Sequence, residues 1–574
     1  MPFHVKTPLT RRHFLKASTL ATSAGLAAPL WLSRALAAGA SPAVDAKPAR
    51  FILDMVQYNP GEPIFETPYA DPQVIQKMGS NGKVYYMFDA PTLAVDWEAV
   101  DPDIFPKGSP GREWVDAKAA RIDAEHAACK AAGIKAYANP DLVVLPKSLV
   151  EKYGMQTTCR DVQNPQTQKF LRLLVGQVFD RFPNLDGLVM RIGETYLQDA
   201  PFHTGGMNNK TNVDNTIIPL IQLLRDEICV KRNKELVFRT WYAFDVNLDT
   251  YLKVSAAIEP DPNLVFSVKH CEGDFHRGNP FSKIIGQGRI PQIIEVQCAR
   301  EYEGKGAYPN YVANGVIEEF EEHRLHPTES KFHSVGEFAR QSPLFAGIWT
   351  WSRGGGWQGP SIKNELWCDL NAWVMAQWAH DPQQPEESVF NRYATEKLAL
   401  NDADVKKFRR LALFSAEAVL RGSVDTMSDI SPEWTRDDGI MRPILPADPV
   451  KLKRVLDEKD EAVKLWEEIL ALAKEINFQD AKTKDYAIIS AEYGLHLYQI
   501  FQAAFHLQAV GVNGDKDDLK TWLAAYDKAW ADYRLLPGKS DQCATLYKEG
   551  KALKTGREGI DQVVAEFRKA AEAK

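Results

Sequence analysis

From residue 50 to about residue 357, the chain alternates short apolar runs with longer stretches whose apolar residues recur every three or four positions. The short runs predict buried strands, and the longer stretches predict amphipathic helices. Eight strands with helical crossovers between them favour the α/β fold class, as a (β/α)8 TIM barrel. A doubly wound open sheet is the alternative, but no glycine-rich dinucleotide motif follows any of the runs. The expected strands lie at 51–58, 83–89, 134–139, 187–192, 236–244, 264–268, 293–297 and 345–351.

After Pro360 the pattern becomes helical throughout. Apolar residues there recur at helical spacing, with charged residues on the opposite face. The sequence therefore predicts a catalytic barrel over 50–360, followed by an all-α C-terminal domain over 361–574. A homodimer interface on these helices is left open by the sequence. The expected helices lie at 364–381, 402–422, 450–476, 484–510 and 519–536.

The first 37 residues have the pattern of an export signal. Arg11 and Arg12 stand before a moderately apolar stretch over 17–32, and small residues at 35–37 suit cleavage. This order is typical of a bacterial twin-arginine signal peptide. We expect the mature protein to begin near Ala38 and to be periplasmic or secreted.

Composition narrows the classes of partner. Of 574 residues, 45% are hydrophobic and 25% are charged, as in ordinary globular proteins, and the length calls for more than one core. The net charge of −7 comes without a basic stripe, which argues against nucleic acid. No segment approaches the roughly 20 apolar residues of a membrane span. The cysteines and histidines show no zinc spacing, so we expect no metal and no cofactor.

Carboxylates gather directly after the sixth and seventh expected strands. Glu272 and Asp274 follow one strand, and Glu301 and Glu303 follow the other. In a barrel the carboxyl ends of all strands meet at one rim, where enzymes of this fold hold their active sites. Cleavage of a glycosidic bond needs a carboxylic acid that protonates the leaving oxygen and a carboxylate that activates water or attacks the sugar. The acidic rim therefore predicts sugar chemistry.

Other strand ends supply further candidates. Glu194 comes just after the fourth strand, where it would reach the same rim as the other acids. Arginines suit an anionic sugar because a guanidinium matches a carboxylate in two-point contact, and indole faces suit the apolar side of a sugar ring. Glu295, inside the seventh strand, is an expected ion-pair partner of Arg191 or Arg239. The candidate substrate-binding residues are Arg191, Arg239, Trp241, Lys269, Arg300, Trp349 and Trp351.

Five segments carry a family resemblance, which covers roughly 185–400. MRIGETY, FRTWYAF, VFSVKHCEGDFHRGNPFSKIIG and IIEVQCAREYEGKG resemble glycoside hydrolase family 67, the α-glucuronidases that remove (4-O-methyl)glucuronic acid from xylan fragments, and NAWVMAQWAHDPQQPEESVFNRYA resembles that family's barrel-to-helix junction. The resemblance implies that Glu194 is the acid, that Asp274 and Glu301 are base candidates, and that Arg239 meets the uronate carboxylate. The chain departs from the family in lacking a β-rich domain before the barrel, in a strand-four motif one residue shorter, and in Arg300, which replaces a glutamine.

The sequence thus predicts an exported, α-glucuronidase-like glycoside hydrolase that cleaves a terminal, acidic sugar from oligosaccharides or polysaccharides. In this interpretation Glu194 donates the proton, and Asp274 or Glu301 activates water with inversion of configuration. One alternative is a retaining glycosidase that uses Glu301 as the nucleophile. Another is an exported carbohydrate-binding barrel without catalysis.

Overall fold

Eight parallel strands close into a barrel in the order β1-β10-β9-β8-β7-β5-β3-β2 in the computed structural model. A helical region follows the barrel, so the predicted fold class is confirmed. Each barrel strand overlaps one of the eight apolar runs. The strands are β1 (Phe51–Gln57), β2 (Gly82–Tyr85), β3 (Lys135–Ala138), β5 (Gly187–Met190), β7 (Glu235–Arg239), β8 (Leu264–Lys269), β9 (Gln292–Gln297) and β10 (Phe345–Gly354).

The structure describes most of the chain after the expected export signal. The signal itself and Glu194, the expected acid, lie outside the described residues. Residues Ala43–Lys574 belong to one compact unit. The described residues are 48–59, 65–86, 90–140, 143–155, 161–192, 197, 199–205, 212–241, 243–245, 247–325, 330–355, 358–423, 440, 442–550 and 558–572.

Both faces of the barrel strands are buried, which explains why the sequence shows continuous apolar runs there instead of alternation. One face of each strand fills the barrel interior, and the other packs under the surrounding segments. Near the rim, Gly354 adopts a φ of +85°, and a Cβ at this position would collide with the Gln57 carbonyl of β1. The close approach of β10 to β1 therefore requires glycine. Interior side chains include Leu53, Met55, Val84, Tyr137, Val189, Val237, Val265, Ile293, Trp349 and Trp351.

Helices follow most barrel strands, and several begin at a residue whose side chain caps the first turn. Ser109 accepts a hydrogen bond from the Arg112 amide at the start of α4, and Ser334 does the same for Glu337 in α11. The helices are α3 (Pro72–Met78), α4 (Pro110–Ala131), α5 (Lys147–Lys152), α6 (Pro165–Arg181), α7 (Ile218–Leu224), α8 (Leu248–Ala257), α9 (Ala313–Ile317), α10 (Glu321–Leu325), α11 (Val335–Gln341) and α12 (Leu366–His380).

Two features of the barrel connections were not predicted. Strands β4 (Val144–Pro146) and β6 (His203–Gly205) form a small antiparallel sheet. The connection from β8 to β9, residues 270–291, is described throughout and contains no helix. Its shape therefore depends on turns and side-chain contacts.

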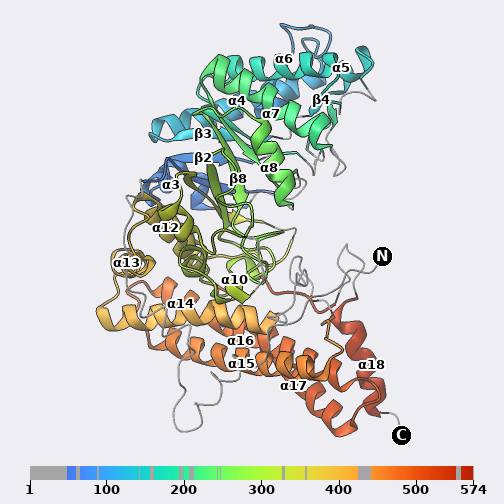
Figure 1. Cartoon of the computed structure of the whole chain (residues 1–574). Coiled ribbons are helices and arrows are strands. Elements are labelled where there is room, and N and C mark those ends of the chain that lie inside the picture. Colours follow the sequence, from blue (N-terminus) through green and yellow to red (C-terminus); the bar gives the residue numbers. More distant parts are fainter. Residues whose placement is uncertain are drawn as a thin grey trace. The chain divides into compact units, whose positions relative to one another are not determined.

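The region after the barrel is helical. It comprises α13 (Glu386–Arg392), α14 (Asp402–Ser423), α15 (Pro449–Glu475), α16 (Ala481–Val510), α17 (Lys516–Lys539) and α18 (Ile560–Glu572), drawn from yellow to red in Figure 1. Helices α14 to α17 overlap predicted segments, whereas α13 and α18 were not predicted. None of the described helices is long and apolar enough to cross a membrane.

The helical region contacts the loop that follows β9. Tyr308 of this loop packs edge-on against Trp466 of α15, with ring centroids 5.6 Å apart. The Tyr498 hydroxyl of α16 lies 3.3 Å from that of Tyr308, and the Tyr486 hydroxyl donates to the Gly306 carbonyl. Aromatic packing and these hydrogen bonds hold the loop against α15 and α16.

A buried ion pair joins α13 to α14. Glu386 is fully buried and accepts two hydrogen bonds from Arg409, at 2.7 and 2.5 Å, and a third from Asn314 at 2.7 Å. Removal of one member of such a pair leaves an uncompensated buried charge.

Arg409→Met is expected to lower the free energy of unfolding by about 3–5 kcal/mol, because Glu386 would remain buried without its cation. The adjacent Arg410→Met is the matched control. Arg410 is 51% exposed and pairs with Glu468 at the surface, so its loss is expected to cost at most about 1 kcal/mol. Urea unfolding of both variants measures the difference, and equal effects would contradict the assignment.

Candidate functional site

The loops after β8 and β9 meet at Asp274. Its Oδ1 accepts a hydrogen bond of 2.8 Å from Lys269 Nζ, and its Oδ2 accepts one of 2.9 Å from the Tyr302 hydroxyl. The Asp274 side chain remains 30% exposed, whereas Lys269 is 6% exposed. The structure therefore fixes a carboxylate at the carboxyl rim with one side open to solvent.

Aromatic rings surround the Lys269 ammonium. Nζ lies 3.1 Å from the centroid of the Trp241 ring and 4.8 Å from that of Phe275. A cation over an aromatic face is attracted by the ring quadrupole, so these contacts hold the Lys269 side chain in place. Phe275 also packs edge-on against Trp351, with centroids 5.2 Å apart. Three of the predicted site residues, Trp241, Lys269 and Asp274, are thus brought together.

A charged pair crosses the barrel interior beneath this rim. Arg239 donates from Nε and Nη2 to the two carboxylate oxygens of Glu295, at 2.9 and 2.7 Å. Ser267 donates to the same carboxylate at 2.8 Å, and both charged side chains are almost fully buried. The expectation that Glu295 pairs with one of the two arginines is confirmed, and its partner is Arg239.

This pairing changes the expected role of Arg239. The guanidinium N–H groups of Arg239, which were expected to bind a uronate carboxylate in two-point contact, donate from Nε and Nη2 to Glu295. The guanidinium also lies 5.3 Å and 5.0 Å from the ring centroids of Trp349 and Trp351. Trp349 is fully buried and Trp351 is 6% exposed, so both rings form part of the barrel interior. Arg239 and the two indoles therefore make the floor of the site.

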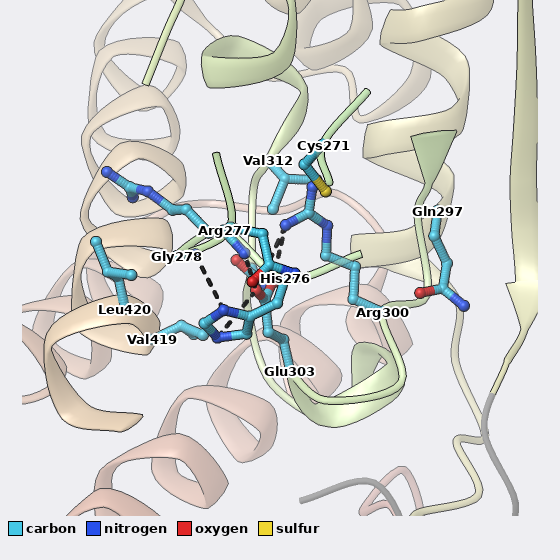
Figure 2. A network of polar contacts seen from close by, with 12 residues as sticks. Cys271, His276, Arg277, Gly278, Gln297, Arg300, Glu303, Val312, Val419 and Leu420 are labelled. Carbon is cyan, nitrogen blue, oxygen red and sulfur yellow. Dashed lines mark hydrogen bonds and ion pairs between the residues drawn. The ribbon is translucent and has the colours of Figure 1, made fainter. Parts of the chain in front are cut away.

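Arg300 lies in a second buried network, which includes Glu303 and His276 (Figure 2). Its Nη2 lies 2.9 Å from His270 Nε2, and its Nη1 lies 3.4 Å from Glu303 Oε1. Because a guanidinium only donates, His270 must be neutral at this nitrogen. Arg300 is 1% exposed, which separates it from solvent.

Burial and neighbouring charges set the protonation of this network. Burial, together with Arg300, holds the pKa of His270 well below its usual value. Burial also lowers the pKa of His276 to about 4, although nearby Glu303 opposes this. For Glu303 burial raises the pKa, but Arg300 and His276 outweigh it and the net pKa is below the ordinary value. Glu303 is thus an ionised anchor within the protein.

Arg277 connects the same loop to the helical region. Its Nε donates to Glu322 at 2.5 Å, and its Nη2 donates to Glu417 of α14. Its backbone amide donates to Glu303 at 2.9 Å. Figure 2 shows Arg277 beside His276 and Glu303, with residues of α14 on the other side. The loop that carries Asp274 is therefore tied to α14 by charge.

The remaining predicted residues have separate surroundings. Glu301 is largely buried, and its backbone amide lies 3.4 Å from Gln297 Oε1 of β9. Arg191, which follows β5, is buried and donates from Nη1 to the Tyr86 hydroxyl at 3.2 Å. Glu272 lies 3.5 Å from Lys283. Glu194 is not among the described residues.

Two residues of the candidate site were missed in the sequence. Tyr302 binds Asp274, and its position directly after Glu301 was the available signal. Asp245 lines a cavity of about 110 Å³ together with Lys269, Cys271 and Glu272. Burial raises the pKa of Asp245 to about 6, an effect that Lys269 opposes. A loop aspartate gives no sequence signal for such a shift, because the shift depends on burial.

The described residues contain no group of three or more histidine, cysteine, aspartate or glutamate side chains arranged for a metal ion. The cysteines of the described part, including Cys271 and Cys298 near the site, are buried and form no disulfide.

The eight parallel strands, closed into a barrel with carboxylates and aromatic residues at its carboxyl rim, form a TIM-barrel fold. No family model and no curated protein matches the chain. Among solved structures, the chain is similar to a GH138 enzyme targeting pectin rhamnogalacturonan II, with 11% identity, a TM-score of 0.52, and coverage of 92% of this chain and 83% of that one.

Two further structures show weaker similarity. The structure of CpGH84D has 11% identity and a TM-score of 0.41, with coverage of 91% of this chain and 75% of that chain. The O-GlcNAc hydrolase of Thermobaculum terrenum has 11% identity and a TM-score of 0.37, with coverage of 86% and 94%. At these identities the similarity shows a fold and no specific family, so the resemblance to family 67 stays a prediction.

Asp245→Asn is expected to change the dependence of stability on pH. The pKa of Asp245 rises from 3.8 to about 6 on folding, so between these values the folded chain holds more protons than the unfolded chain. The free energy of unfolding therefore falls as pH rises through this window, and asparagine removes that contribution. Urea unfolding from about pH 4 to about pH 7 should show wild-type stability falling relative to the variant. A constant difference would contradict the shifted pKa.

Proposed function

We propose that this protein is a glycoside hydrolase that removes a terminal acidic sugar from polysaccharide fragments. The observation that carries the proposal is the Lys269–Asp274–Tyr302 arrangement at the carboxyl rim. An ammonium and a hydroxyl both donate to Asp274, which leaves this side chain as an acceptor. A carboxylate in this state suits the base that activates water.

Glu301 is the second carboxylate of the proposal. It follows β9, as Asp274 follows β8, and these two strands are neighbours in the barrel. Glu194, which follows β5 in the sequence, remains the proposed proton donor. An acid on one side of the sugar and a base on the other describe the inverting mechanism.

The basic residues of the site suit an acidic sugar. Because Glu295 occupies the two-point fork of Arg239, Lys269 and Arg191 become the proposed contacts of the uronate carboxylate. An ammonium has three donors, and only one of the three is needed for Asp274. Trp241, whose ring lies against Lys269, is the proposed sugar platform.

Two further elements belong to the proposal. The expected twin-arginine signal would export the enzyme to the periplasm or outside the cell, where polysaccharide fragments are met. The chain shares its fold with a GH138 enzyme targeting pectin rhamnogalacturonan II. We propose a plant polysaccharide as the source of the substrate.

Asp274→Asn and Glu301→Gln are each expected to lower kcat by roughly 10²–10⁴-fold, because the amides keep the shape of the side chain but cannot accept a proton. The assay follows sugar release from a panel of uronate-decorated oligosaccharides. Full activity of both amide variants would exclude this site.

The matched control is Glu259→Gln, another Glu-to-amide change with unaltered kcat expected. Glu259 precedes β8, at the opposite end of the barrel, and its side chain is 75% exposed. NMR of the first-formed product anomer separates the two mechanisms. Inversion supports Asp274 as base, and retention would instead assign Glu301 as the nucleophile.

A further inference from the structure

Several buried polar atoms of the barrel have no hydrogen-bond partner among the described residues. Most buried polar groups in proteins are paired, so each exception calls for a ligand, a water molecule or a functional role. Three of the side chains concerned are nearly inaccessible, with Asn139 at 0%, Arg239 at 1% and Trp351 at 6% exposure. The atoms are both amide atoms of Asn139, Gln57 Oε1, Arg239 Nη1, Trp349 Nε1 and Trp351 Nε1.

These atoms belong to one face of the barrel wall. Alternate residues of a strand share a face. Asn139 stands two positions after Tyr137, and Gln57 two after Met55, and both preceding residues fill the barrel interior. The Asn139 backbone N–H donates to the Tyr85 carbonyl at 2.8 Å, which continues the strand pairing to the rim.

The set comes from strands on opposite sides of the barrel. Asn139 follows β3, Gln57 ends β1, Trp351 lies in β10 and Arg239 ends β7. An eight-stranded barrel is just wide enough to hold side chains or one small ligand. Polar atoms at the carboxyl end of its inner face can therefore contact a single small molecule at the same time.

The balance of hydrogen-bond donors and acceptors among these atoms indicates which class of molecule they can bind. Indole, guanidinium and amide N–H groups outnumber the two acceptor oxygens, on Asn139 and Gln57. A sugar ring presents the complement, because each hydroxyl accepts more hydrogen bonds than it donates and a carboxylate only accepts.

We propose that Asn139, Gln57 and Trp351 bind the hydroxyl groups of the terminal sugar. The inference rests on the proposed function and adds inner-face residues of β1, β10 and the end of β3 to the site. Arg239 Nη1 and Trp349 Nε1 are two further donors on the same inner face. The bound sugar supplies the hydrogen bonds that these atoms lack.

A second buried amide in the barrel shows the contrast. Gln292, at the amino end of β9, donates from Nε2 to the Tyr251 hydroxyl at 2.6 Å and to the Ile284 carbonyl at 2.9 Å. Its Oε1 accepts from the Gly286 amide at 2.7 Å. The fold satisfies this amide, whereas it leaves that of Asn139 open.

The test compares Asn139→Leu with Gln292→Leu. Leucine removes the amide at similar volume, so loss of an unpaired buried amide should leave the melting temperature unchanged or raise it. Loss of the satisfied Gln292 amide should lower the melting temperature instead. Ligand-observed NMR titration with D-glucuronate, and with D-glucose for comparison, measures binding by each folded variant. Asn139→Leu is expected to weaken D-glucuronate binding at least ten-fold, and Gln292→Leu to leave it unchanged.

Several outcomes would overturn the inference. One is unaltered sugar binding by Asn139→Leu with raised stability, which would mean that no sugar pairs with the Asn139 side-chain amide. Another is a large loss of stability in this variant, which would mean that the fold pairs the amide. Absence of saturable binding of both sugars by the wild type would also overturn it.

The outcome for these inner-face residues is separable from the outcome for catalysis. Asp274→Asn is expected to bind D-glucuronate as the wild type does while turnover is lost. If binding depends on Asn139 but no oligosaccharide is cleaved, sugar binding by these residues is supported and the proposed hydrolase activity is contradicted. If cleavage occurs and Asn139→Leu binds D-glucuronate normally, only the proposed role of Asn139 in sugar binding is contradicted. Gln57→Leu, with the same expected weakening, gives a second and independent variant.

Discussion

The Arg239–Glu295 ion pair constrains the positions of the candidate site residues at the carboxyl rim. Two charges are held inside the barrel, away from water, and both carboxylate oxygens are satisfied by Arg239 and Ser267. Any rotation of either side chain would leave an unpaired charge away from water. The pair therefore fixes the relative positions of β7, β8 and β9, the three strands whose loops carry Trp241, Asp274 and Tyr302.

The rim residues depend on a second set of charges placed outside the barrel interior. Glu303 accepts from Asn310 and from the Arg277 amide, and Arg300 lies between Glu303 and His270. Because both histidines of this network are kept neutral by burial, their protonation would break it. The site thus has a rigid support of paired charges, and the Asp274 carboxylate is the part above it that reaches solvent.

Much of the fold could be predicted from the sequence, because strands buried on both faces leave continuous apolar runs. The pairing of strands β4 and β6 could not, since three-residue strands carry no periodicity. For the site, the sequence located Trp241, Lys269 and Asp274 because strand ends converge in a barrel. It did not decide between Arg191 and Arg239 as the partner of Glu295, because the chain does not reveal which side chain lies opposite and only the fold places Arg239 there. The open amide of Asn139 depends on the absence of partners, which no local pattern shows.

The helix-free connection between β8 and β9 has a wider consequence. A helix would hold its own shape through backbone bonds, but this segment takes its shape from contacts such as that of Arg277 with Glu417, a residue more than a hundred positions further along the chain. Sequence change in a distant helix is therefore transmitted to the loop that carries Asp274. Substitutions in α14 can shift this loop without changing any residue within it, and grafting the barrel alone onto another protein would separate the loop from its support.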